Sequence, residues 1–322
     1  MQSDTTLYDV IIVGGGPAGL SAALYAARRG LKVLLVTKDL GGQAARTPEI
    51  ENYPGLPLMN GFDIMDAFAK QAQKFGARLE FQEVTGLTKC EDETFSVHTP
   101  TAMFITHTVI LAFGLTPRDL GVPGETQLRG RGVSYCPTCD GSFFKGKIVA
   151  VAGGSIGALD ASESLSRLCK KVYLIHQGTA LSGNPILKSK VEQTHNITIH
   201  LETRVLEILG KEQVAGIKVQ DAASVIRTIN LDGIFVEMGY IVKSAWVKDL
   251  VTLDKRQQVI VNQHCETSTP GIFAAGDATT LEYKQVVISA GEGAKAALAA
   301  YKYIQLRQGK RSVVIPDWGF TK

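Results

Sequence analysis

The chain has 322 residues, which is enough for two domains of ordinary size. Its 34 Lys and Arg residues and 31 Asp and Glu residues leave a formal net charge of +3, and no basic run is typical of a nucleic-acid-binding patch. Hydrophobic residues make up 45% of the chain, as in a protein with a full core, but no apolar stretch is long enough to span a bilayer.

The first part of the chain predicts a nucleotide-binding unit. Residues 1–8 are polar and lack the features of a signal peptide, so we expect a cytoplasmic protein. Residues 8–13 and 32–37 predict strands, and residues 20–29 predict a helix between them. The first strand and the helix are joined by the pattern Gly-x-Gly-x-x-Gly, formed by Gly14, Gly16 and Gly19.

Each of these three glycines has a purpose in a dinucleotide-binding turn. The first permits the tight turn, the second lets the backbone approach a pyrophosphate, and the third allows the helix to pack closely on the strand. A simple turn is the alternative interpretation, but the flanking strand and helix favour a nucleotide site.

Cys136 and Cys139 form a Cys-x-x-Cys pair that Asp140 follows directly. This spacing permits a small disulfide ring and can poise a thiolate near neutral pH, while Asp140 can exchange a proton with a leaving thiolate. Half of a zinc site is the alternative, but the other three cysteines are isolated and no second ligand pair is present. We therefore predict a redox dithiol and no metal.

A second nucleotide-type unit begins near Lys147. Residues 148–152 and 172–176 predict strands, residues 153–158 form a Gly-rich turn, and residues 160–168 predict a helix. Because the same sequence of elements occurs twice, we expect an α/β fold with two Rossmann-like nucleotide-binding domains.

The remaining segments predict how these two domains are connected. Residues 108–125 and 231–239 each combine a strand-like run with glycine and are interpreted as crossings between domains. The Ala-rich helix predicted over 285–306 returns to the first domain. We expect an FAD-binding domain of residues 1–117 and 247–322, interrupted by an inserted NAD(P)-type domain of residues 118–246 that carries the cysteine pair.

Taken together, these motifs resemble the low-molecular-weight thioredoxin reductases over most of the chain. Residues 269–278 also resemble the segment of two-domain flavin reductases in which an Asp binds a ribityl hydroxyl. The motifs that carry the resemblance are residues 14–19, 41–43, 50–55, 112–118 with Phe113 in place of Thr, 136–141, 276–277, and 284–285 with Lys in place of Arg.

The resemblance implies one FAD per chain and a homodimer. It implies that Cys139 receives electrons from the flavin, that Cys136 attacks the disulfide of a thioredoxin-like protein, and that Asp140 is the acid–base group. The residues expected to bind FAD are Gly14, Gly16, Pro17, Ala18, Gly19, Thr37, Lys38, Gly42, Gln43, Asn52, Val84, Ala112, Gly114, Gly276, Asp277, Lys284, Gln285, Val286 and Trp318.

The second nucleotide site departs from the family pattern. Ser155 replaces the glycine that approaches the pyrophosphate, so its side chain would crowd the phosphate. The next strand ends His176-Gln177-Gly178 instead of the His-Arg-Arg that clamps the 2′-phosphate of NADPH. Lys188 and Lys190 could offer only point charges to the 2′-phosphate. No acidic residue at the end of this strand could bind the ribose of NADH. We therefore doubt a working nicotinamide site.

A second departure is the C-terminal segment 309–322, which contains Trp318 and Phe320. A disordered terminus is the commoner fate of such segments. Our hypothesis is that one of these rings stacks near the flavin, with the flavin of the partner subunit as one option.

Both departures resemble a subgroup of pyridine-nucleotide-independent thioredoxin reductases, some of them ferredoxin-linked. In that interpretation a reduced ferredoxin supplies single electrons to FAD. Three alternatives stay open: an FAD-dependent dithiol oxidase that uses oxygen, a redox-sensing module that holds two nucleotides, and an NADPH-dependent thioredoxin reductase with an atypical site.

Overall fold

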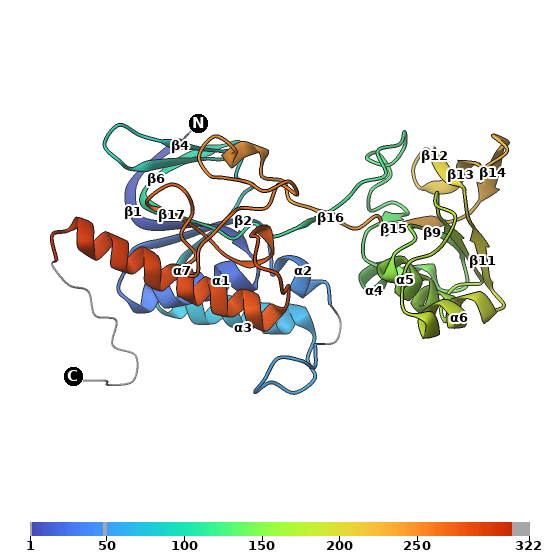
Figure 1. Cartoon of the computed structure of the whole chain (residues 1–322), viewed down its shortest axis with the longest axis horizontal. Helices are drawn as coiled ribbons and strands as arrows, with labels where there is room; N and C mark the ends of the chain where they lie inside the picture. Colours follow the sequence, from blue (N-terminus) through green and yellow to red (C-terminus); the bar gives the residue numbers. More distant parts are fainter. Residues whose placement is uncertain (1, 48–49, 311–322) are drawn as a thin grey trace. The chain divides into compact units, whose positions relative to one another are not determined.

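The structure is a computed structural model that describes residues 2–47 and 50–310 (Figure 1). It divides into two compact units, the first within residues 1–115 and 242–322, the second within residues 116–241. The chain therefore crosses between units at 115–116 and at 241–242, a few residues before each of the boundaries expected from the sequence.

The first unit is built on one mixed sheet with the strand order β3-β2-β1-β6-β5-β4 and with β17 beside the end of β6. The parallel strands are β1 (Gln2–Gly15), β2 (Val33–Leu40), β3 (Arg78–Phe81), β6 (Ala102–Leu111) and β17 (Ile272–Ala274). An antiparallel hairpin, β4 (Gly86–Lys89) and β5 (Phe95–His98), extends the sheet from β6.

Three long helices cover this sheet: α1 (Pro17–Arg28), α3 (Gly61–Lys74) and α7 (Val286–Arg307) (Figure 1). Helix α1 packs against both α3 and α7. Its contact with α7 is close, because a Cβ atom on Gly293 would collide with the carbonyl oxygen of Ala18. The shorter elements of the unit are α2 (Gly42–Ala45), η2 (Ala245–Val247) and η3 (Gly276–Ala278).

The second unit has a parallel sheet with the order β11-β10-β9-β15-β8. Its strands are β8 (Val133–Ser134), β9 (Ile148–Ala152), β10 (Lys171–Ile175), β11 (Ile197–His200) and β15 (Gly233–Val236). The helical elements are α4 (Pro137–Asp140), η1 (Gly141–Phe144), α5 (Ile156–Ser166) and α6 (Pro185–Gln193).

A three-stranded antiparallel sheet completes the second unit. It consists of β12 (Arg204–Gly210), β13 (Val214–Gln220) and β14 (Ile226–Asn230). The short strands β7 (Thr116–Pro117) and β16 (Tyr240–Ile241) pair antiparallel where the chain enters and leaves the unit.

The expected fold class, two Rossmann-like α/β units, is confirmed. The strand predicted over 148–152 coincides with β9, but the helix expected to begin at residue 160 begins at Ile156. Ser155 is its N-cap residue, so the Gly-rich turn runs directly into the helix. Among the described residues, no helix is long and apolar enough to cross a membrane.

Candidate functional site

The first glycine-rich turn joins β1 to α1. A Cβ atom on Gly14 would collide with the carbonyl oxygen of Ala112, and one on Gly19 would collide with the carbonyl oxygen of Gly14. Gly16 is different, since the nearest atom to its Cβ position is the carbonyl oxygen of Gly41 at 3.9 Å. Protein packing therefore explains the first and third glycines, while the open space at Gly16 suits the close approach of a phosphate.

The N-terminus of α1 leaves room for the same anion. No side chain caps this helix, and Pro17 occupies its first turn. The free amide groups at the start of a 12-residue helix carry partial positive charge and favour a phosphate. The turn and the helix together fit the pyrophosphate of a dinucleotide such as FAD.

Thr37, within β2, holds this turn in place. Its hydroxyl accepts a hydrogen bond from the Gly15 amide (2.9 Å) and donates one to the Asp39 carbonyl (2.6 Å). The side chain is buried, whereas the neighbouring Lys38 is exposed. The structure thus gives Thr37 a positioning role that the sequence did not indicate.

The structure brings several of the expected flavin-side residues into hydrogen-bonded contact. Gln43 donates from Nε2 to the Leu115 carbonyl (3.3 Å), which links α2 to the segment after β6 that contains Gly114. Asn52 donates a hydrogen bond from Nδ2 to Oε1 of Gln285 (3.1 Å). Gln285 is the residue directly before α7, which begins at Val286. Val84 is partly buried against the core around the end of β1.

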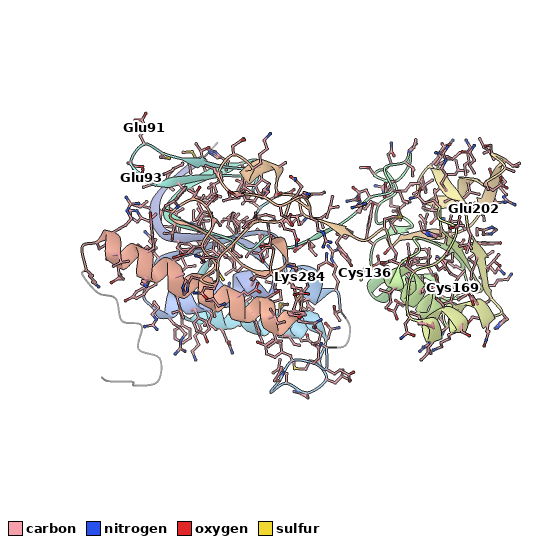
Figure 2. All side chains as sticks on the ribbon, in the orientation of Figure 1. Glu91, Glu93, Cys136, Cys169, Glu202 and Lys284 are labelled. Carbon is pink, nitrogen blue, oxygen red and sulfur yellow. The ribbon has the colours of Figure 1, made fainter. Side chains whose placement is uncertain are left out.

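A buried carboxylate that the sequence analysis missed supports the loop of Gly276 and Asp277. Glu292, on α7, accepts a hydrogen bond from the Gly276 amide (2.7 Å), and burial raises the pKa of its side chain. Ser289 donates to Asp277 (3.1 Å). Lys284 donates to the Thr279 carbonyl (2.8 Å), and burial lowers its pKa (Figure 2).

The dithiol segment begins after β8 in the second unit and continues into α4, which contains Cys139 and Asp140. Cys136, labelled in Figure 2, lies between these two elements and is disulfide-bonded. The Ser134 hydroxyl accepts a hydrogen bond from the Cys136 amide (3.1 Å) and donates one to Oδ2 of Asp140 (2.6 Å). One hydroxyl thus ties the cysteine backbone to the expected acid–base group. Cys139 belongs to α4 by its backbone, but its side chain lies outside the described part of the structure.

The other three cysteines are free. Burial raises the pKa values of Cys169 and Cys265 to about 11, so these thiols stay protonated and unreactive at neutral pH. Cys90 is partly exposed. Within the described residues, no group of three or more His, Cys, Asp and Glu side chains could hold a metal ion.

A second network fixes Tyr135, the residue before Cys136. Its hydroxyl donates to Oε1 of Glu125 (2.7 Å) and accepts from Arg129 (2.9 Å), whose guanidinium lies over the Tyr135 ring. Burial, followed by the hydrogen bond to Glu125, raises the pKa of Tyr135. Glu125 also accepts hydrogen bonds from the backbone amides of Leu120 and Gly121. No sequence motif predicted this network.

The second glycine-rich turn has a histidine side chain against it. A Cβ atom on Gly154 would collide with the ring of His176, the residue directly after β10, so this ring lies against the turn. Ser155 precedes α5 without capping it through its side chain. Lys190 already forms an ion pair with Glu163 (2.7 Å), so its charge is partly committed within the protein.

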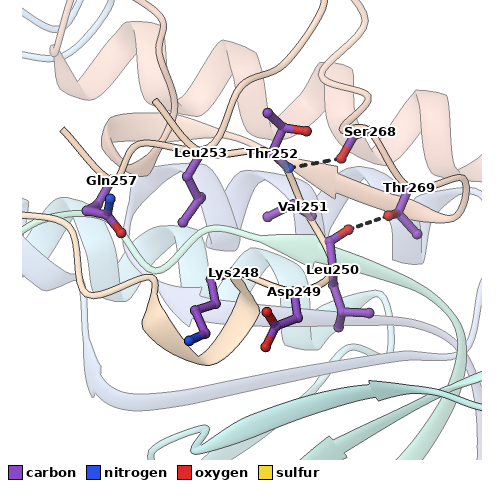
Figure 3. A pocket seen from close by; sticks show the side chains of 9 residues that line it. All are labelled: Lys248, Asp249, Leu250, Val251, Thr252, Leu253, Gln257, Ser268 and Thr269. Atoms are coloured by element: carbon purple, nitrogen blue, oxygen red, sulfur yellow. Dashed lines mark hydrogen bonds between the residues drawn. The ribbon is translucent and has the colours of Figure 1, made fainter. Parts of the chain in front are cut away.

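The hollow shown in Figure 3 is not part of either site. It is an open, mainly polar depression in the first unit, lined by residues 248–253, Gln257, Ser268 and Thr269. None of the residues expected to bind FAD or to exchange electrons lines it. Trp318 and Phe320 lie outside the described residues.

Comparison with known proteins places this geometry among disulfide oxidoreductases. Residues 8–294 match the family described as pyridine nucleotide-disulphide oxidoreductase. An alkyl hydroperoxide reductase subunit of Staphylococcus aureus is 37% identical over 303 residues, which are 92% of this chain and 59% of that protein. The chain therefore spans about three fifths of the length of the curated relatives it matches.

Solved structures are similar over nearly their whole length. Thioredoxin reductase from Lactococcus lactis is 33% identical with a TM-score of 0.79, covering 93% of this chain and 99% of that one. A ferredoxin-flavin thioredoxin reductase from Clostridium acetobutylicum is 30% identical with a TM-score of 0.54, covering 95% and 100%.

Proposed function

The chain belongs to the pyridine nucleotide-disulphide oxidoreductase family, and we propose that it is an FAD-dependent disulfide reductase that works without a nicotinamide cofactor. Electrons pass from the flavin to Cys136 and Cys139, and from them to a thioredoxin-like protein. The observation that carries this proposal is the disulfide-bonded Cys136 beside the Ser134–Asp140 pair.

FAD is assigned to the first unit because the residues there fit it. The open space at Gly16 and the uncapped N-terminus of α1 suit the pyrophosphate. The loop of Asp277, held by Ser289 and by Glu292 through Gly276, offers a carboxylate for the ribityl chain. When bound, FAD supplies the electron pair that reduces a disulfide.

The exchange with the partner protein is assigned to the two cysteines in turn. The Cys136 thiolate attacks the partner's disulfide, one partner sulfur leaves as a thiolate, and a mixed disulfide forms. Cys139 then attacks Sγ of Cys136, which restores the internal disulfide and releases the partner as a dithiol. Two electrons and two protons reach the partner in each cycle, and Asp140 exchanges protons with the leaving thiolates.

One surface feature supports a protein partner for this exchange. Phe143 is 73% exposed, although it lies only four residues after Cys139. A large apolar side chain exposed beside a redox pair suits contact with another protein. We assign that role to a thioredoxin-like disulfide protein, and we infer a homodimer from the family resemblance.

We infer ferredoxin as the electron donor from the resemblance to the nicotinamide-independent subgroup, and the second glycine-rich turn supports this because it lacks what a nicotinamide dinucleotide requires. Ser155, the loss of the arginines after His176 and the ion pair of Lys190 all disfavour NADPH. A cytoplasmic location agrees with Cys90, Cys169 and Cys265, which are free thiols.

The test is to mix the FAD-loaded protein anaerobically with NADPH, NADH or chemically reduced ferredoxin and to follow the absorption band of oxidised flavin. We expect ferredoxin to bleach the band and the nicotinamides to leave it unchanged. Reduction of a thioredoxin disulfide should then require Cys136 but not Cys90, so Cys136→Ser is inactive and Cys90→Ser is the matched control. Rapid bleaching by NADPH would refute nicotinamide independence, and oxygen uptake with a dithiol alone would favour the dithiol oxidase.

A further inference from the structure

The two glycine-rich turns occupy equivalent places in the two units. Val13 pairs with Val36 before the first turn, and Ala152 pairs with Ile175 before the second. Each residue of the first turn therefore has a counterpart in the second turn, a fixed number of residues later in the chain. The strand on the other side of each turn corresponds as well. The Ala112 amide donates to the Val13 carbonyl (2.8 Å), and the Glu237 amide donates to the Ala152 carbonyl (2.8 Å).

Glu237 is therefore the counterpart of Ala112. A Cβ atom on Gly14 would meet the carbonyl oxygen of Ala112, and one on Gly153 would meet that of Glu237. The backbones agree, but the side chains differ in size and charge. The turn in the first unit faces a methyl group, whereas the turn in the second unit faces a carboxylate.

This carboxylate points to the start of α5. Oε2 of Glu237 lies 3.2 Å from the Cβ position of Gly157, which is in the first turn of that helix. The side chain of Ser155 does not cap the helix, so the partial positive charge at its N-terminus attracts the carboxylate. Ser155, two residues before Gly157, is the counterpart of Gly16, where the first unit is open.

The charge around this turn disfavours a second anion. Burial, followed by the negative charge of Asp160 on α5, raises the pKa of Glu237 to about 7. The ring of His176 lies on the turn at Gly154 and takes up further space. A pyrophosphate would have to displace these groups or lie beside the carboxylates.

We propose that Glu237 excludes nicotinamide dinucleotides from the second unit by placing its own carboxylate at the pyrophosphate position of the glycine-rich turn. This inference rests on the nicotinamide independence of the proposed function and names the residue that causes it. Above pH ~7 the side chain of Glu237 is a carboxylate, and like charges brought together in a partly buried site oppose binding. At lower pH the carboxyl group still occupies the space.

The test measures binding of NADH, which lacks the 2′-phosphate and so does not need the missing arginines. Glu237→Ala restores the side chain found at the equivalent position of the first unit, and Glu237→Gln removes the charge at almost constant size. We expect the double variant Glu237→Ala with Ser155→Gly to bind NADH at least about tenfold more tightly than the unaltered protein, a ratio that corresponds to ~1.4 kcal/mol. Calorimetric titration of the FAD-loaded protein gives the dissociation constants.

Glu212→Gln is the matched control, because it removes an exposed carboxylate from the turn between β12 and β13. It should leave the affinity for NADH unchanged. If every Glu237 variant with an unchanged melting temperature binds NADH as weakly as the unaltered protein, the inference is overturned. That outcome leaves the proposed function standing, because nicotinamide independence is tested separately, by whether NADH or NADPH bleaches the flavin of the unaltered protein.

Discussion

Ser134 connects the backbone of Cys136 to the carboxylate of Asp140 through one hydroxyl group. The hydrogen bond to Asp140, at 2.6 Å, involves a charged acceptor and is therefore among the stronger kinds in proteins. It fixes the direction of the carboxylate that, in the proposed cycle, exchanges protons with the leaving thiolates. Ser134 has no redox or acid–base step of its own in that cycle, so we expect its contribution to be the positioning of Asp140.

Replacing Ser134 should therefore slow the exchange without affecting the fold. We expect Ser134→Ala to lower kcat for disulfide reduction about tenfold, since a lost hydrogen bond to a charged group is worth ~1.5 kcal/mol. Ser134→Thr keeps the hydroxyl and should retain most of the activity, and Ser142→Ala removes an exposed hydroxyl nearby as a control. Equal kcat values for Ser134→Ala and the unaltered protein, at equal FAD content, would show that Asp140 is held by other means.

Glu237 also makes the stability of the second unit depend on pH. Its pKa is raised from the ordinary 4.5 to about 7 in the folded protein. Because its pKa is raised, the folded protein binds the proton of Glu237 more tightly than the unfolded chain does. This contribution to the free energy of unfolding is fully present below pH ~4.5 and is lost as the pH rises toward 7.

Glu237→Gln should remove this dependence. The free energy of unfolding of the variant, relative to that of the unaltered protein, should increase between pH 4.5 and 7 by on the order of 1–2 kcal/mol, a figure reduced to allow for the partial exposure of Glu237. Urea unfolding at several pH values, followed by far-UV circular dichroism, gives the difference. A difference that does not vary with pH would mean that Glu237 titrates as it does in the unfolded chain.

At the scale of elements, the contact of α1 with α7 links the glycine-rich turn to the loop of Gly276 and Asp277. Both helices begin next to the expected flavin: α1 directly after Gly16, and α7 after Gln285. Their backbones approach so closely at Ala18 that only glycine fits at position 293. The distance between the two halves of the expected FAD site is thus set by this crossing.

Two glycines of α7 allow a matched test of that contact. Gly293→Ala would force α7 away from α1, so we expect a loss of ~1–3 kcal/mol in stability and weaker retention of FAD. Gly291→Ala meets no atom within 4 Å, and alanine favours the helix, so this variant should be neutral or stabilising by up to ~1 kcal/mol. Melting temperature and bound FAD per chain measure both effects, and equal results for the two variants would contradict the close contact.

The local elements could be predicted because their signals are local. A β-branched run followed by a Gly-rich turn predicted β9 with its observed bounds, and the long Ala-rich segment predicted α7 to within one residue at each end. The start of α5 was misplaced because Gly157 was assigned to the turn, although it lies in the first helical turn. The three-stranded sheet from β12 to β14 was not predicted, since no turn motif marks it.

The supporting residues of the site depend on contacts between distant parts of the chain. Glu292 contacts Gly276 across 16 residues, and Glu237, directly after β15, contacts the turn at Gly153 from more than 80 residues later in the chain. The sequence marked the positions that a cofactor or a partner would contact, such as Gly16 and Cys136. It could not mark the residues that hold them, because spacing along the chain says nothing about those contacts.

At the scale of the whole molecule, the two units have separate cores. The core clusters of the first unit contain Ile12 and Phe95, and those of the second contain Ile217 and Leu159, with no cluster shared among the described residues. A ligand that binds only the folded state stabilises the unit that holds it. If FAD belongs to the first unit, its removal should lower the stability of that unit and leave the other unchanged.

The tryptophans make this separation measurable. The chain has two, Trp246 and Trp318, and neither falls within residues 116–241. Trp246 is a described residue of the first unit, so its fluorescence reports unfolding of that unit, while far-UV circular dichroism reports both units. Removing FAD should shift the fluorescence transition to lower temperature, because a ligand at 100 times its dissociation constant contributes ~2.7 kcal/mol. The unfolding transition that appears in circular dichroism but not in fluorescence belongs to the second unit, and its midpoint temperature should not change. A joint shift of both transitions would mean that the two units unfold together or that FAD contacts both.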